Sequence, residues 1–219
     1  MRMADFSRAI DILANEGFHG TINVSGGETT LHPRLADMLR LASERLPRST
    51  ITVFTNGSWV GRRNWERRLR ALSAGPNVII NYSLDRQHVE GAWRVAQGRP
   101  IEEVEAELFD RARRFLDACR QVPAVPFRFA FKGTRRQAGA YLRRLGDVPV
   151  YLIQFQRFPA RRPKTPGVAA VEVNRANRVL VFPTLGHIPR GEALGGLETL
   201  RAALQFNRDA ISKDRRRAR

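Results

Sequence analysis

Strand-like and helix-like segments alternate through the first 158 residues, and this alternation constrains the fold more than any other feature of the sequence. Five short apolar or alternating segments are separated by stretches long enough to form helices. A chain with this alternation folds through right-handed βαβ crossovers into a parallel sheet. The predicted strands are Gly20–Val24, Ser49–Phe54, Asn77–Ser83, Phe127–Phe131 and Val148–Phe155.

The segments around these strands carry the 3.6-residue apolar period of amphipathic helices. The predicted helices are Met1–Gly17, Pro33–Arg45, Trp59–Leu72, Ile101–Arg120 and Arg135–Leu145. Because the chain opens on a helix, the first strand is predicted to have no neighbour on one side. An uncovered parallel strand is an aggregation hazard. The pattern therefore predicts a fold that lacks an element at its front.

After Phe158 the alternation stops. A Pro- and Arg-rich connection over Pro159–Gly167 is followed by two short β-branched segments with a turn between them, which predicts a hairpin of Ala170–Val173 and Val179–Phe182. A final helix is predicted over Leu197–Ile211. We therefore expect a core domain of residues 1–158 and a C-terminal extension of residues 159–219.

Length and charge limit the classes of protein to consider. A chain of 219 residues can bury the core of one domain. No apolar run approaches the roughly 20 residues that span a bilayer, and no cleavage site follows the first helix, so a soluble, cytoplasmic protein is expected. The net charge is +17, from 35 arginines and three lysines against 21 acids. This charge favours anionic cofactors, acidic partners or nucleic acid, although the basic residues are spread over many predicted helix faces.

The segment between the first strand and the next helix, Ser25-Gly26-Gly27-Glu28-Thr29-Thr30-Leu31-His32-Pro33, is the strongest candidate for a binding site. Two glycines let the backbone approach a ligand closely. The start of the following helix offers N–H groups to a carboxylate or phosphate, and Glu28 can pair with an ammonium. Such a loop suits a zwitterion such as an amino acid. An ordinary strand-to-helix turn is the alternative interpretation.

This loop resembles the GGEP motif of the radical S-adenosylmethionine (radical SAM) superfamily, with Thr29 in place of the proline. Two more motifs end the next two predicted strands: Thr55-Asn56-Gly57 resembles the TNG of the family, and Ser83-Leu84-Asp85 resembles its S-x-D. The resemblance implies a partial parallel βα barrel that lacks its first strand, with S-adenosylmethionine bound at the strand ends. The residues it implies for the cofactor are Ser25, Gly26, Gly27, Glu28, Thr55, Asn56, Ser83 and Asp85.

The sequence departs from the family at the cysteines. Members carry C-x3-C-x2-C, whose thiolates hold the 4Fe-4S cluster that cleaves S-adenosylmethionine to a radical. This chain contains only Cys119, which falls on the apolar stripe of the helix Ile101–Arg120 and is expected to be a buried core residue. No histidine pair has metal-ligand spacing, so no metal site is predicted. We expect either a shortened chain of a radical SAM enzyme or a member without the cluster.

The C-terminal extension also resembles a part of this superfamily, but less specifically. The segment Val173–Ile188 resembles the hairpin of SPASM or twitch extensions, again without the cysteine that would bind an auxiliary cluster. Such a tail would favour a peptide or protein substrate or partner chain. Three interpretations remain: a radical SAM enzyme represented by a shortened chain, an accessory protein that binds S-adenosylmethionine or a peptide, and a basic nucleic-acid-binding protein on the same scaffold.

Overall fold

The computed structural model of the chain comprises two compact units. The described residues are 1–25, 28–73, 75–84, 86–122, 126–132, 139, 141, 143–146, 153–156, 170–173, 179–182, 192–202 and 204–205. One unit is His19–Arg157, and the other combines Met1–Phe18 with Phe158–Arg219. The second boundary lies next to residue 158, where the sequence suggests that the core ends, whereas no sequence signal marks a boundary after Phe18. The division into residues 1–158 and 159–219 stays a prediction.

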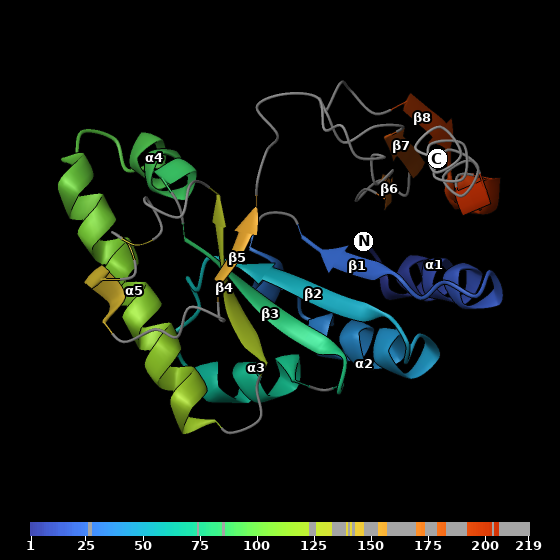
Figure 1. Cartoon of the computed structure of the whole chain (residues 1–219), viewed down its shortest axis with the longest axis horizontal. Helices are drawn as coiled ribbons and strands as arrows, with labels where there is room; N and C mark the ends of the chain where they lie inside the picture. Colours follow the sequence, from blue (N-terminus) through green and yellow to red (C-terminus); the bar gives the residue numbers. More distant parts are fainter. Residues whose placement is uncertain are drawn as a thin grey trace, which may run out of the picture. The chain divides into compact units, whose positions relative to one another are not determined.

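A parallel sheet forms the centre of the unit His19–Arg157 (Figure 1). Its strands lie in the order in which they occur in the chain, and every neighbouring pair is parallel. The α/β class with a parallel sheet of βα units is therefore confirmed. Among the described residues β1 pairs only with β2, so β1 forms one edge of the sheet, as the sequence predicts. The strands are β1 (Thr21–Val24), β2 (Thr50–Thr55), β3 (Val78–Ser83), β4 (Phe127–Lys132) and β5 (Ile153–Gln156).

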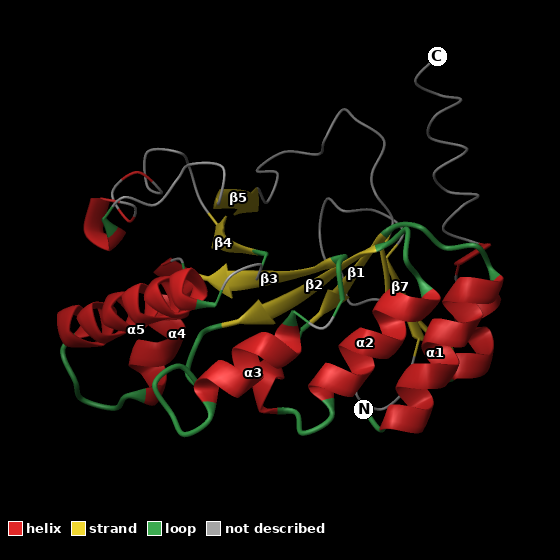
Figure 2. Ribbon diagram, turned by 90° about the horizontal axis from the view of Figure 1, so that it is seen from below, coloured by secondary structure: helices red, strands yellow, loops and turns green. Residues whose placement is uncertain are grey.

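Helices cover one face of this sheet. In Figure 2, α2, α3 and α5 lie on the same side of the strands. The described helical elements of the unit include η1 (Thr29–Leu31), α2 (Leu35–Arg45), α3 (Trp65–Leu72), α4 (Arg86–Val95) and α5 (Ile101–Gln121), and residues 139, 141 and 143–145 are helical as well. The side chains of α5 that follow the apolar period predicted for it, among them Leu108, Phe115 and Cys119, are buried. The expectation that Cys119 is a core residue is thereby confirmed.

Aromatic side chains make the core under β3 and β4. The Tyr82 ring lies 4.7 Å from the ring of Phe115 and 5.5 Å from that of Phe129, measured between centroids. Trp59 contacts Phe115 edge to face at 6.4 Å. Tilted and edge-to-face arrangements of this kind add about 0.5–1.5 kcal/mol per pair to the free energy of burial. This cluster gives the strands that end at the candidate site a rigid support.

The side chain of Asn77 stabilises the amino end of the sheet through hydrogen bonds. The amide nitrogen of Asn77 donates to the carbonyl oxygens of Leu46 at 2.9 Å and Ser49 at 2.7 Å. Its amide oxygen accepts a hydrogen bond from the hydroxyl of Ser43. The backbone N–H of Ile51 also donates to the carbonyl of Asn77 at 2.9 Å. Asn77 therefore holds the end of α2 and the start of β2 against the start of β3.

The structure differs from the predicted elements in two places in this unit. The helix predicted to begin at Trp59 begins at Trp65, because the chain first turns through left-handed conformations at Gly57, Gly61 and Asn64. The helix α4 was not predicted at all. The predicted helix 135–145 and strand 148–155 fall partly outside the described residues.

The other unit contains α1 (Met3–Asn15) and a three-stranded antiparallel sheet of β6 (Ala170–Val173), β7 (Val179–Phe182) and β8 (Glu192–Gly195). The predicted hairpin is β6 and β7, which pair in antiparallel register, whereas β8 was not predicted. A 3-10 turn, η3 (Leu197–Thr199), and helical residues 200–202 and 204–205 occupy the start of the predicted final helix. Ala9 packs against Leu197, Leu200 and Leu204.

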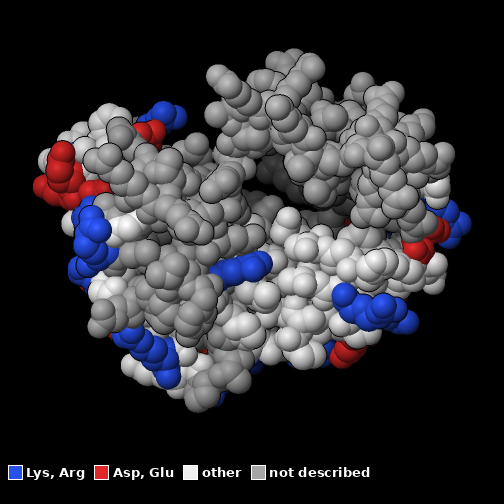
Figure 3. All heavy atoms as spheres, viewed as in Figure 1, with Lys and Arg blue, Asp and Glu red and all other residues white. Residues whose placement is uncertain are grey.

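No helix among the described residues is long and apolar enough to cross a membrane. On the face shown in Figure 3, the Lys and Arg side chains of the described residues lie in separate groups. This distribution matches the spread of basic residues in the sequence. It gives no continuous basic track for nucleic acid on the described part of that face.

Candidate functional site

The candidate site lies at the carboxyl ends of β1, β2 and β3. Ser25 follows β1, Thr55 ends β2 with Asn56 directly after it, and Ser83 ends β3. Because neighbouring parallel strands end at the same edge of a sheet, the three motifs share this edge. The register pairs Thr55 with Tyr82, one residue before Ser83. Gly26, Gly27 and Asp85, which were also predicted to bind the cofactor, lie outside the described residues.

Glu28 joins the first motif to the second. Its Oε1 accepts hydrogen bonds from the hydroxyl of Thr55 at 2.7 Å, from the backbone N–H of Thr30 at 3.2 Å and from the Thr30 hydroxyl. Its Oε2 accepts the backbone N–H of Asn56 at 2.9 Å. Hydrogen bonds to a charged group contribute about 1.5–3 kcal/mol each. The carboxylate therefore holds the loop after β1 against the end of β2.

The hydroxyl of Thr55 has no capacity left for a ligand. It donates to Glu28 and accepts from the backbone N–H of Gly57 at 3.0 Å and from the indole Nε1 of Trp59 at 2.9 Å. One donor and two acceptor positions are all that a hydroxyl offers. Thr55 was predicted to be a cofactor-binding residue. In this arrangement its side chain instead positions Glu28 and Trp59.

Trp59 and Tyr82 are buried next to the TNG segment. The sequence did not identify either residue as part of the site. Each is almost completely buried, with an exposed fraction of 0% for Trp59 and 1% for Tyr82. Gly57 has a φ of +71°, and a Cβ built on it would lie 2.4 Å from Cε2 of Tyr82. Two reasons therefore require a glycine at this position: its left-handed backbone conformation and the close approach of the Tyr82 ring. The aromatic residue two positions after TNG could have indicated from the sequence that Trp59 belongs to the site.

The N–H groups at the start of η1 and α2 are largely used within the chain. Those of Leu31, His32 and Leu35 donate to the carbonyls of Glu28, Thr29 and His32, respectively. The Arg34 N–H donates to Nδ1 of His32 at 3.2 Å, and Glu28 accepts from that of Thr30. The sequence predicts that N–H groups at the start of the helix Pro33–Arg45 are open to an anion. Of these, the N–H groups of Arg34 and Leu35 already have acceptors in the structure.

Four polar groups at this edge keep capacity for a ligand. The Ser25 hydroxyl, the Asn56 side-chain amide nitrogen and the Ser83 hydroxyl have no hydrogen-bond partner among the described residues. Glu28 Oε2 accepts a single bond, and a carboxylate oxygen has room for two. The set combines neutral donors with one carboxylate. Its chemistry fits a zwitterion whose ammonium faces Glu28 and whose carboxylate faces the neutral donors.

Cys119 does not fit the ligand set of an iron–sulfur cluster. Its side chain is 6% exposed on the buried face of α5, and burial raises the pKa of the thiol to about 12. Cluster ligation requires several thiolates, whereas this is one protonated thiol among 219 residues. In the described part of the chain, no group of three His, Cys, Asp or Glu side chains could hold a metal ion.

No family model matches the sequence, and no curated protein matches it either. Two solved structures of BtrN are similar. One, in an open conformation, is 12% identical with a TM-score of 0.44, and the match covers 99% of this chain and 72% of that chain. The other, in complex with AdoMet and 2-DOIA, is 14% identical with a TM-score of 0.44, with coverage of 99% and 73%. A similarity this distant leaves the function of the chain to be inferred from its own residues.

Proposed function

We propose that this chain is a member of the radical SAM superfamily that binds S-adenosylmethionine at the carboxyl ends of β1, β2 and β3 and holds no iron–sulfur cluster of its own. The observation that supports the proposal is the set of hydrogen bonds from Thr55 and Asn56 to Glu28. These bonds join two motifs that are far apart in the sequence and that both resemble cofactor-binding segments of that superfamily.

The available groups match the methionine end of the ligand. Its ammonium would pair with the open side of Glu28 Oε2. Its carboxylate would accept from the side chains of Ser25, Asn56 or Ser83. Each hydrogen bond that involves a charged group contributes roughly 1.5–3 kcal/mol before the entropy lost on binding is counted. Three or four such bonds give a Kd in the micromolar-to-millimolar range.

Titration calorimetry of the full chain with S-adenosylmethionine tests the proposal. Ser83→Ala is the most informative variant, because the hydroxyl has no partner in the described part of the chain. We expect this variant to keep its thermal stability and to bind severalfold more weakly. Asp85→Ala is expected to weaken binding by a similar factor. Glu66→Ala, which removes an exposed acid in the first turn of α3, is the matched control and should bind as the parent chain does.

Glu28 needs a separate readout, because its carboxylate also holds the loop in place. Glu28→Gln leaves an NH₂ group facing a hydrogen-bond donor in either orientation of the amide. We therefore expect it to lower both stability and affinity. No heat at millimolar ligand would contradict the proposal. Reductive cleavage of the ligand to 5′-deoxyadenosine by the chain with dithionite would contradict the part that concerns the cluster.

A further inference from the structure

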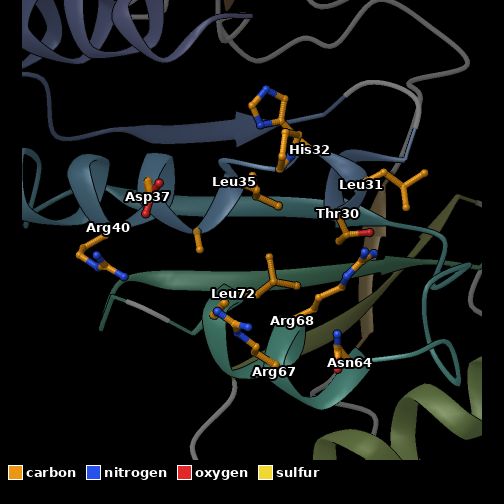
Figure 4. Close-up of a pocket in the computed structure, with 13 residues that line it drawn as sticks. Thr30, Leu31, His32, Leu35, Asp37, Arg40, Asn64, Arg67, Arg68 and Leu72 are labelled. Carbon is orange, nitrogen blue, oxygen red and sulfur yellow. The ribbon is translucent and has the colours of Figure 1, made fainter.

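A groove lies on the helical side of the unit, between η1 and α2 on one side and α3 on the other. Its volume is about 530 Å³. Figure 4 shows the side chains of Arg40 from α2 and of Arg67 and Arg68 from α3 extending into the space between these helices. The groove is separate from the groups that Ser25, Asn56 and Ser83 offer to a ligand, since none of these residues lines it.

The groove has an excess of positive charge. Arg40, Arg67 and Arg68 are exposed, and none forms a hydrogen bond or ion pair through its side chain in the described part of the chain. Asp37, the acidic residue among those that line the groove, is engaged by Arg34 at 2.5 Å. On α5, in contrast, acidic residues pair with Arg99, Arg111, Arg114 and Arg120. The three guanidinium groups therefore remain available to an anionic ligand.

The floor of the groove is apolar. Leu35 and Leu72 are buried at its base, and Ala36 and Ala71 leave room beside them. Leu31, which is 51% exposed, adds an accessible apolar side chain to the lining. His32 supplies the one aromatic ring among the lining residues, and no Phe, Tyr or Trp lines the groove. Proteins that bind single-stranded nucleic acid stack successive bases on several aromatic rings, so the lining favours a ligand with carboxylates and apolar side chains.

We propose that this groove docks an acidic segment of a partner protein. An apolar side chain of the segment rests on Leu31, Leu35 and Leu72, and its carboxylates pair with Arg40, Arg67 and Arg68. Arginine suits this role because its planar guanidinium binds a carboxylate through two parallel hydrogen bonds. The apolar contact supplies affinity, and the charge pairs select an acidic partner and speed its association.

Fluorescence anisotropy with the full chain tests the proposal. The probe is a short labelled peptide of glutamate and leucine at helical spacing. Comparison peptides carry glutamine in place of glutamate, or alanine in place of leucine, and single-stranded DNA of equal charge is the fourth ligand. We expect the Glu/Leu peptide to bind at least about tenfold more tightly than each of the other three.

Charge reversal in the chain locates the binding. Arg40→Glu with Arg68→Glu should weaken binding of the Glu/Leu peptide by about tenfold or more. Arg48→Glu with Arg94→Glu changes the net charge equally at two exposed arginines outside the groove and should weaken it less than about twofold. Arg40→Gln with Arg68→Gln gives the same readout with less risk to folding, which circular dichroism checks. Equal weakening by the control pair, or tighter binding of the DNA, would overturn the proposal.

Discussion

The hydroxyl of Thr55 donates to the carboxylate of Glu28 at 2.7 Å, across 27 positions of sequence. This bond links the loop after one strand to the end of the next. The same hydroxyl accepts from the Gly57 N–H and from the Trp59 indole. A small side chain therefore fixes the relative position of two of the three segments that make up the candidate site.

We expect Thr55→Val to lower the free energy of unfolding by about 2–4 kcal/mol. The substitution leaves the buried indole N–H of Trp59 and the N–H of Gly57 without acceptors, and each unsatisfied group costs about 1–3 kcal/mol. Thr55→Ser keeps the hydroxyl and should cost only about 1 kcal/mol for the lost methyl group. Urea unfolding of both variants measures the difference. A loss in Thr55→Val no larger than that in Thr55→Ser would contradict the contribution assigned to these hydrogen bonds.

Gly57→Ala is expected to cost roughly 2–5 kcal/mol. A left-handed backbone costs a non-glycine residue about 1–2 kcal/mol, and the new Cβ would press on the Tyr82 ring. Gly98→Ala is the matched control, because Gly98 has a φ of +78° with open space around it. It should cost only the conformational part. Thermal or urea unfolding that gives the same loss for both variants would contradict the close approach of Tyr82.

We expect Tyr82→Phe to raise the free energy of unfolding by about 1 kcal/mol. The buried hydroxyl of Tyr82 has no hydrogen-bond partner among the described residues, so its removal eliminates a desolvation cost. Tyr141→Phe removes a hydroxyl that donates to Glu105 and should not stabilise the chain. A stability loss in Tyr82→Phe comparable to that of Tyr141→Phe would contradict this expectation.

Tyr82 also makes the free energy of unfolding depend on pH. Burial raises the pKa of Tyr82 in the folded chain. The phenol therefore loses its proton at a lower pH in the unfolded chain than in the folded chain. As a result, the free energy of unfolding falls as the pH rises above about 10. The slope of stability against pH in this range should be smaller in Tyr82→Phe. Unfolding by urea at a series of alkaline pH values measures the slope.

Cys119 should be unreactive in the folded chain. With a pKa of about 12, the thiolate fraction at pH 8 is on the order of 10⁻⁴, and the side chain is buried as well. We expect a thiol reagent to label the native chain at least about 1000-fold more slowly than the urea-unfolded chain. Rapid labelling of the native chain would show that α5 opens or that the thiol is exposed.

Anaerobic reconstitution with iron and sulfide should likewise give no stable 4Fe-4S cluster, since a single buried thiol cannot replace several thiolates. Visible absorption and EPR provide the measurement. A stoichiometric cluster signal that disappears in Cys119→Ala would show that the thiol can ligate iron after all.

The sequence predicts the strands well because their signal is local. Alternating or continuous β-branched residues mark β2 and β3, and the hairpin of β6 and β7 follows from the same pattern. The apolar stripe that contains Cys119 is equally local. Because parallel strands end at a common edge, their order along the chain was sufficient to bring Ser25, Asn56 and Ser83 to that edge.

The roles of Glu28 and Thr55 could not be predicted in the same way. Both read as ligand-binding residues, because a motif records which residue types occur and not which hydrogen bonds they form. The bonds between the two segments join residues far apart in sequence, and the hydroxyl of Thr55 is filled in addition by Gly57 and Trp59. The late start of α3 depends on the left-handed conformation of Asn64, which asparagine adopts more readily than most residues but which the sequence alone does not specify.

The hydrogen bonds of Asn77 have a consequence for the dynamics of the sheet. They tie α2, β2 and β3 together at the amino end, far from the candidate site. A side chain that reinforces the backbone hydrogen bonds makes local opening rarer. Asn77 acts in this way at the amino end of β2, and the Thr55–Glu28 bond acts at its carboxyl end. Amide hydrogen exchange of Ile51 should therefore become faster in Asn77→Ala, while exchange at Thr55 stays as in the parent chain.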